Sequence, residues 1–393
     1  MKCAGPAAFG AGVLSLIWLA PAAHADDDAP DAPVTLSFVY KGDIAGTLAG
    51  GASRAGRYLD NLELVTDASL EKLIGWNGAQ LHAHLLSNSG GAPNDIAGTL
   101  QGVDNIEVAR PRAKLYEFWV EQSFAGDHGS VLAGLYDLNS EFYQSETAGL
   151  LLAPAFGIGS ELAATGPNGP SIFPSTALAL RVRWSFSQHE RVQAALIDAS
   201  AGVLGDPGGV DTSFDNGALM IAEWAHGDAA QFKLGAWRYT RQQDDIRDMD
   251  TLGAPVKREA QGVYVAVEAP LWGGDGPRAV SGFARFGVAD GDTTPYHGGW
   301  QAGLLVSRVF AGRPESALAI GLNQGVVDEK FRANMRDGGQ DPAHAESALE
   351  LTYFDRIAPH LTLQPDLQII HDPGADVSRD DVVTAALRFG IEF

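Results

Sequence analysis

Residues 178–186 read LALRVRWSF, and their alternation decides the fold class. The even positions hold large apolar side chains, and the odd positions hold Arg181 and Arg183 between two small residues. Successive side chains of a β-strand point to opposite faces, so one face of this segment is apolar and the other is charged. The stretch therefore predicts a strand with an apolar surface on one side and water on the other.

The same period of two recurs along the chain, most clearly in residues 79–85 and 361–369. Together with noisier segments it predicts about sixteen strands, separated by turns rich in glycine. The other candidate strands lie at 34–48, 57–66, 115–124, 130–137, 191–198, 217–225, 231–240, 260–268, 279–288, 299–308, 316–323, 346–354 and 383–393. A short helix is predicted around 67–73, and a loop or helical stretch around 139–152.

The first 25 residues have the features of a secretory signal peptide. Lys2 precedes the apolar stretch 7–20, which ends in the A-x-A pattern of residues 23–25. An N-terminal membrane anchor is the alternative, but the apolar stretch is short for one. We therefore predict cleavage after Ala25, which leaves residues 26–393 as one domain without cysteine.

Composition excludes several classes of protein. The 393 residues carry a net charge of −22, which argues against nucleic acid as a partner because a phosphate backbone needs Lys and Arg. After the signal peptide no apolar run approaches the ~20 residues of a transmembrane helix. A β-barrel stays possible, because its strands need only ~10 alternating residues.

Alternation also occurs in soluble sandwiches and β-solenoids, but two features favour a membrane barrel. The polar face of the strand at 115–124 mixes large charged and aromatic groups, Glu117, Trp119 and Glu121, which suits a wet interior. The chain also ends as an alternating strand whose last residue is Phe393. We predict an all-β fold, a transmembrane antiparallel β-barrel of about 16 strands with one or more inward-folded loops, since closure leaves no unpaired backbone in lipid.

Several motifs, in this order, resemble those of the carbohydrate-selective outer-membrane porins of the OprB type. They are GGASRAGRY (50–58), LEKLIGW (70–76), LYEFWVEQ (115–122), GLYDLN (134–139), LGAWRYT (234–240) and QPDLQIIHDPG (364–374). The resemblance implies a sixteen-stranded barrel in the bacterial outer membrane that passes monosaccharides by diffusion through a sugar-favouring constriction. Residues 96–112 and 166–174 depart from the family pattern.

A porin breaks no bonds, so its functional residues are those that line the channel. Arginine offers five hydrogen-bond donors to sugar hydroxyls, and aromatic rings stack on the apolar face of a pyranose. By strand face, the candidates for channel lining and sugar contact are Arg181, Arg183, Arg285, Glu117, Trp119, Glu121, His82 and Arg57. The alternative role of each is to hydrate the wall or to form an interior ion pair.

Other functions find little support in the motifs. No catalytic motif is evident, so we predict no enzyme and no cofactor. His82 and His84 share one strand face and could hold a metal ion from it, but no matching cysteine or carboxylate cluster is evident, so no metal site is predicted. The functional alternatives are a non-selective diffusion porin and an exported β-sheet sugar-binding protein.

The predicted partners follow from this location. They are small carbohydrates, the outer-membrane lipid with its lipopolysaccharide, and the barrel-assembly machinery, which would recognise the strand that ends in Phe393. Both a monomer and a trimer are compatible with the sequence.

Overall fold

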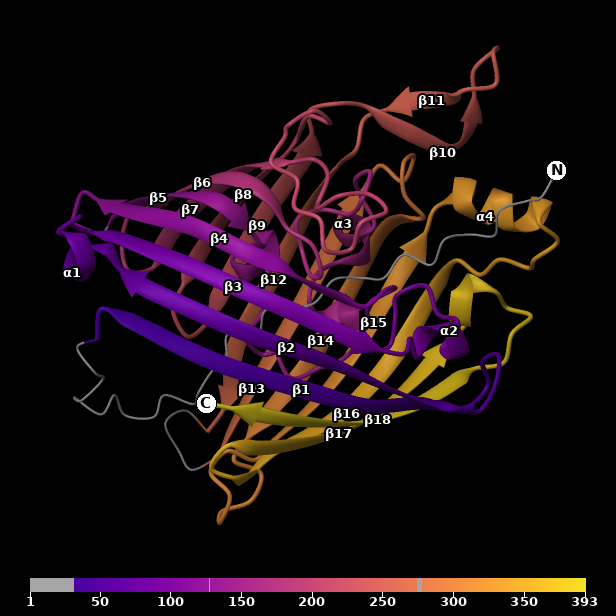
Figure 1. The fold of residues 1–393 in the computed structure, drawn as a ribbon. Coiled ribbons are helices and arrows are strands. Elements are labelled where there is room, and N and C mark those ends of the chain that lie inside the picture. The colour runs from indigo at the N-terminus through magenta and orange to yellow at the C-terminus, as the bar shows by residue number, and fades with distance from the viewer. Residues whose placement is uncertain (1–31, 127, 274–277) are drawn as a thin grey trace.

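A computed structural model describes residues 32–126, 128–273 and 278–393, so the predicted signal peptide lies outside the described residues. Sixteen of its strands form one closed antiparallel barrel (Figure 1). These are β1 (Val34–Ala49), β2 (Gly56–Ser69), β3 (Ala79–Gly90), β4 (Arg112–Phe124), β5 (Gly129–Tyr136), β6 (Ala177–Ser185), β7 (Glu190–Asp198), β8 (Ala218–Gly227), β9 (Gln231–Tyr239), β12 (Gln261–Trp272), β13 (Ala279–Ala289), β14 (Tyr296–Ser307), β15 (Ala317–Val327), β16 (Ala345–Ala358), β17 (Leu361–His371) and β18 (Val382–Glu392).

The remaining elements lie in the connections. A separate hairpin is formed by β10 (Gln243–Met249) and β11 (Pro255–Arg258). The helices are α1 (Leu70–Ile74), α2 (Asn94–Ala97), α3 (Ser160–Ala163) and α4 (Glu329–Asp337), with short 3-10 turns at Leu138–Ser140, Pro154–Phe156 and Pro373–Ala375. None of the helices in the described residues is long and apolar enough to cross a membrane.

The barrel closes between its first and last strands. β1 pairs antiparallel with β18, with Val39 opposite Glu392 and Ala45 opposite Ala386. Each barrel strand therefore has a partner on both sides, and no open edge exposes unpaired backbone groups to lipid. This closure confirms the predicted barrel, and the sixteen segments expected from alternation coincide with its sixteen strands within a few residues.

The two faces of each strand differ as the sequence predicts. On β6 the side chains of Leu180 and Val182 face outward, and these residues are 48% and 46% exposed. Arg181 between them points inward and is 0% exposed. An apolar outer surface around a charged interior suits lipid outside and water within, so the soluble sandwich and solenoid alternatives are wrong.

The connections differ in length at the two ends of the barrel. Figure 1 shows α1 and the C-terminal end of the chain at one end, while β10, β11, α2 and α4 lie at the other. Short turns mark the periplasmic end of such barrels and long loops the extracellular end. The longest extracellular connection, residues 137–176, follows β5 and folds into the lumen.

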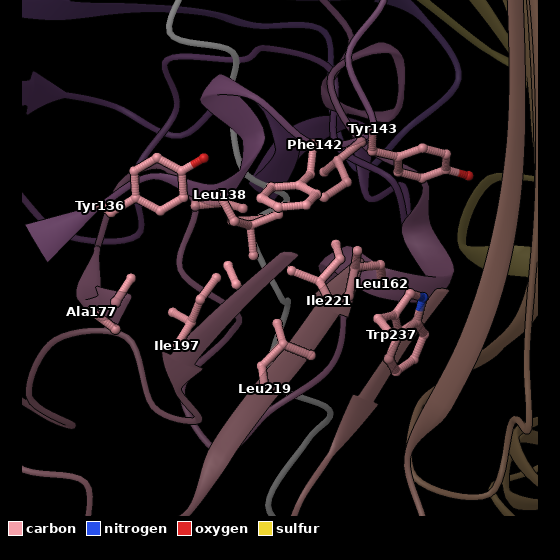
Figure 2. Packing of buried hydrophobic residues seen from close by; sticks show 14 of the residues in the cluster. Tyr136, Leu138, Phe142, Tyr143, Leu162, Ala177, Ile197, Leu219, Ile221 and Trp237 are labelled. Atoms are coloured by element: carbon pink, nitrogen blue, oxygen red, sulfur yellow. The ribbon is translucent and has the colours of Figure 1, made fainter. Parts of the chain in front are cut away.

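An apolar cluster holds the start of this loop against the wall. Figure 2 shows Leu138 and Phe142 of the loop close to Ile197, Leu219 and Trp237, which come from β7, β8 and β9. Their side chains are at most 3% exposed, so the interior of the barrel is packed here rather than open. The predicted inward-folded loop is confirmed.

Helix α4 and the β10–β11 hairpin, both at the extracellular end, were not predicted from the sequence. Helix α4 begins at the N-cap Asp328, whose side chain accepts a hydrogen bond from the Lys330 N–H, and it buries only Met335. A helix with one buried residue carries little apolar periodicity. The β10–β11 hairpin also lacks a periodic signal. Its strands pair with each other outside the barrel, and apolar and polar residues do not alternate along them.

Candidate channel site

Carboxylates on the wall hold the inward loop, residues 137–176, by its backbone N–H groups. Glu223 on β8 accepts a hydrogen bond from the Tyr143 N–H at 3.0 Å. Glu350 on β16 accepts one from the Ala153 N–H at 2.9 Å. β8 and β16 are separated by five strands of the barrel, so the loop is tied at well-separated points of the wall and crosses the lumen.

Arg285 on β13 fastens the middle of the same loop. Its guanidinium donates to the carbonyl oxygens of Tyr143 and Gly157 at 2.8 and 2.9 Å and also to that of Phe156. Arg285 faces the lumen, as expected, but it is only 1% exposed. The expectation that Arg285 contacts sugar is corrected, because the loop covers the guanidinium and takes up its donors.

A second loop, residues 91–111, is also tied to the channel wall, at β16, β18 and β1. Glu346 on β16 accepts a hydrogen bond from the Gln101 N–H at 2.9 Å. Arg388 on β18 pairs with Asp43 on β1 at 2.6 Å and donates to the Asn105 side chain at 2.6 Å. Part of the stretch that departs from the family pattern is thus fixed to the channel wall.

Two arginines and two glutamates form a charged cluster on the channel wall, here called the Arg–Glu cluster. Arg181 on β6 reaches Glu121 on β4 at 2.9 Å and Glu141 of the inward loop at 2.7 Å. Arg183 reaches the same two carboxylates at 2.9 and 3.2 Å. The side chain of Arg181 is 0% exposed and that of Arg183 is 30% exposed, so the two predicted arginines differ. Arg181 is the buried member that supports the cluster, and Arg183 is the member that faces the channel.

An aromatic surface continues the cluster along β4. Trp119 lies two residues from Glu121 on the same face, and the His82 ring stacks on the Trp119 ring with centroids 4.7 Å apart. Glu117, on that face as well, is 4% exposed and lies behind the His82 ring, which leaves Trp119 and His82 as the half-buried members. The structure thus brings Trp119, His82 and Glu121 together with Arg183 on one wall.

Arg57 lies away from this wall. It is opposite Ala45 near the extracellular end of β2, is exposed, and donates to the Gly56 carbonyl at 3.1 Å. Arg57 therefore lies at the mouth of the channel.

Charged residues that the sequence did not single out complete the wall. Lys41 on β1 and Glu63 on β2 form an ion pair at 3.1 Å, and an Asp67 carboxylate oxygen accepts a hydrogen bond from His82 Nδ1 at 2.7 Å. The alternation of side chains between the two faces of a strand could have placed these three residues on the lumen face. No periodic signal could have found Glu141, because it lies in a loop and reaches the arginines only through tertiary folding.

Known proteins match the chain over most of its length. The family model described as "Carbohydrate-selective porin, OprB family" matches residues 53–393. Porin B of Pseudomonas aeruginosa is 24% identical over 395 residues, which cover 90% of this chain and 86% of that protein.

Solved structures share the fold. The high-pH structure of Pseudomonas putida OprB superposes with a TM-score of 0.81 at 24% identity, covering 92% of this chain and 94% of that one. The outer-membrane channel DcaP of Acinetobacter baumannii gives a TM-score of 0.56 at 11% identity, covering 92% and 97%.

The family match and the closed barrel agree on location and class. The protein is an integral outer-membrane β-barrel and a sugar channel, and the family and fold are those of channel proteins rather than enzymes. With a family match over residues 53–393, the chain belongs to the OprB family of carbohydrate-selective porins.

Proposed function

We propose that the channel passes small sugars, of monosaccharide size, together with ions by passive diffusion, and that the sugars are contacted on the wall formed by Arg183, Glu121, Trp119 and His82. The observation that carries this proposal is the 30% exposure of the Arg183 side chain beside two half-buried carboxylates. Guanidinium donors and carboxylate acceptors match the two roles of a sugar hydroxyl.

The aromatic surface adds a second type of contact. One face of the Trp119 ring is covered by His82 at a centroid distance of 4.7 Å, so a pyranose would use the remaining face or edge of the ring. Arg181 and Glu117 support this wall from behind. The cluster also sets ion preference, because its carboxylates limit the positive potential of the arginines.

Planar-bilayer conductance with added glucose tests the proposal. We expect glucose to reduce the ion current through the wild-type channel and to reduce it less in the variant Arg183→Gln. The matched control is Arg238→Gln, since the Arg238 side chain is 50% exposed at the outer end of β9 and pairs with Glu259 at 2.6 Å. If glucose left the wild-type current unchanged, the sugar contacts would be refuted and a non-selective diffusion channel favoured.

The other partners remain predictions. The apolar outer faces of the strands support contact with outer-membrane lipid and lipopolysaccharide. Recognition of the last strand by the barrel-assembly machinery is a separate prediction.

A further inference from the structure

Two histidines and a glutamate converge on one point of the channel wall. His82 and His84 lie two residues apart on the lumen face of β3, and Glu117 on β4 is directly opposite His84. Glu117 Oε2 is 3.7 Å from His82 Nε2 and 3.7 Å from His84 Nδ1. The three side chains offer ligand atoms that all lie within 4.8 Å of one another.

A further carboxylate lies on the far side of each imidazole. His82 Nδ1 is 2.7 Å from an Asp67 carboxylate oxygen, which favours the tautomer that leaves Nε2 free. His84 Nε2 is 3.5 Å from a Glu63 oxygen. Carboxylates behind the ligating imidazoles are a usual feature of metal sites, because they orient the ring and raise its basicity.

Glu117 is oriented in the same way. Its Oε1 accepts hydrogen bonds from the Asp137 N–H at 3.0 Å and from Trp119 Nε1 at 3.3 Å, which leaves Oε2 for a further ligand. The His82 ring is fixed by its stacking on Trp119, and the His84 ring by an edge contact with Tyr116 at 5.0 Å. The site is therefore built before any ion arrives.

Two buried nitrogens of the site, His82 Nε2 and His84 Nε2, have no hydrogen-bond partner among the described residues. His82 Nε2 is buried and forms no hydrogen bond with any residue that the structure describes, since its 3.7 Å separation from Glu117 is too long for one. A buried polar atom without a partner is unfavourable, so an unpaired nitrogen that faces a carboxylate indicates a missing ligand.

We propose that His82, His84 and Glu117 bind a divalent transition-metal ion of the zinc type. Tetrahedral zinc with bonds of about 2.0–2.1 Å places its ligands about 3.3–3.4 Å apart, so the three ligand atoms, which lie within 4.8 Å of one another, must move closer together to complete the site. Two imidazoles select such an ion over Mg²⁺ and Ca²⁺, which prefer oxygen ligands. The side chain of His82 is 14% exposed, so the site lies just beneath the surface of the channel wall, with its ligand nitrogen Nε2 covered.

Bound Zn²⁺ would change the channel, because it adds two positive charges to a wall whose carboxylates attract cations. The ion would lie beside Trp119 and next to the residue where the inward loop leaves β5. We therefore expect it to lower the cation current. This proposal does not depend on sugar contact, because it concerns a different ligand and is tested without sugar.

Isothermal titration of the purified full-length protein in detergent with Zn²⁺ at pH 8 tests the site. We expect one tight site per chain, an affinity loss of more than tenfold in His82→Gln and in Glu117→Gln, and a loss of about 10- to 100-fold in Asp67→Asn. The control is the double variant His189→Gln/His226→Gln, whose histidines are exposed at the periplasmic end, and it should bind like the wild type. Equal affinity in all variants, or Mg²⁺ binding as tight as Zn²⁺ binding, would overturn the proposal.

Two further readouts use the wild-type protein and so do not depend on the folding of a variant. Co²⁺ should give the intense visible absorption of a tetrahedral ion with nitrogen ligands. Zn²⁺ should lower the single-channel conductance in sugar-free salt, and a chelator should restore it. A Co²⁺ spectrum of the hydrated ion together with a conductance unchanged by Zn²⁺ would refute the site.

Discussion

The guanidinium of Arg285 donates to the carbonyl oxygen of Tyr143 at 2.8 Å and so joins the middle of β13 to the loop that crosses the lumen. Replacing Arg285 by Leu leaves the loop carbonyls without donors, at about 1–3 kcal/mol for each buried group. We expect Arg285→Leu to loosen the loop, so that single-channel conductance in planar bilayers becomes larger and more variable.

The matched control for this variant is Arg278→Leu. Arg278 also donates to a backbone carbonyl, that of Val309 at 2.6 Å, but it lies at an exposed periplasmic turn. Its conductance should equal that of the wild type. If Arg285→Leu had the same stable conductance as both, the loop would be held without this anchor.

Arg181 and Arg183 share the same two glutamates, yet replacement by Met should affect different properties of the protein: its stability for Arg181 and its ion selectivity for Arg183. Removing the buried Arg181 leaves Glu121 and Glu141 poorly compensated, and breaking a buried pair costs about 3–5 kcal/mol. Removing the partly exposed Arg183 should cost less than about 1 kcal/mol and instead shift ion selectivity towards cations. Denaturant unfolding in detergent and reversal potentials measure the two effects. Equal destabilisation by both variants would contradict this division.

How far the sequence predicts the molecule depends on whether a residue lies on a strand. Parity alone places Arg181 and Arg183 inside and Leu180 outside, because a strand has only two faces. The alternation of side chains along a strand does not show which of them the inward loop covers. It therefore cannot distinguish the buried Arg285 from the partly exposed Arg183. The pairing of Glu117 with His84 depends on the register of β4 against β3, which shifts at a bulge between His84 and Leu85.

The outer face of β6 offers a direct test of the lipid boundary. Leu180 is 48% exposed on this face, one residue from the inward Arg181. An arginine on the lipid side near the membrane midplane costs about 2–4 kcal/mol. We expect Leu180→Arg to lower the free energy of unfolding in lipid vesicles by this amount. The control Leu180→Ile should change it by less than about 1.5 kcal/mol. No difference between the two variants would mean that Leu180 does not face the hydrocarbon.

Lys330 of α4 joins two extracellular loops. Its ammonium contacts Asp245 and lies 2.9 Å from Asp248, both on β10, and lies 2.6 Å from Asp292. Replacing Lys330 by Met leaves three carboxylates facing one another, with only Arg258 to pair with the first two. We therefore expect α4 to hold the hairpin less tightly, with the contacts of Arg247 to Asn334 and Asp337 remaining, and the hairpin to be cut faster by proteinase K in the Lys330→Met variant.

The pKa of Asp245 determines the pH at which the contact between Lys330 and the hairpin weakens. Burial opposes ionisation of Asp245, but hydrogen bonds from Lys330 and from nearby backbone N–H groups outweigh it and hold the Asp245 pKa below its usual 3.8. A carboxyl group whose pKa is lower in the folded state stabilises the fold at pH values above its unfolded pKa. This stabilisation is lost as the pH falls through the folded pKa. Protection of the hairpin should thus be constant from pH 8 to about pH 5 and weaken only below the ordinary Asp pKa of about 3.9. Hydrogen exchange of the hairpin amides, corrected for intrinsic rates, measures it. Protection that fell already between pH 7 and pH 5 would show that another group holds the hairpin in place.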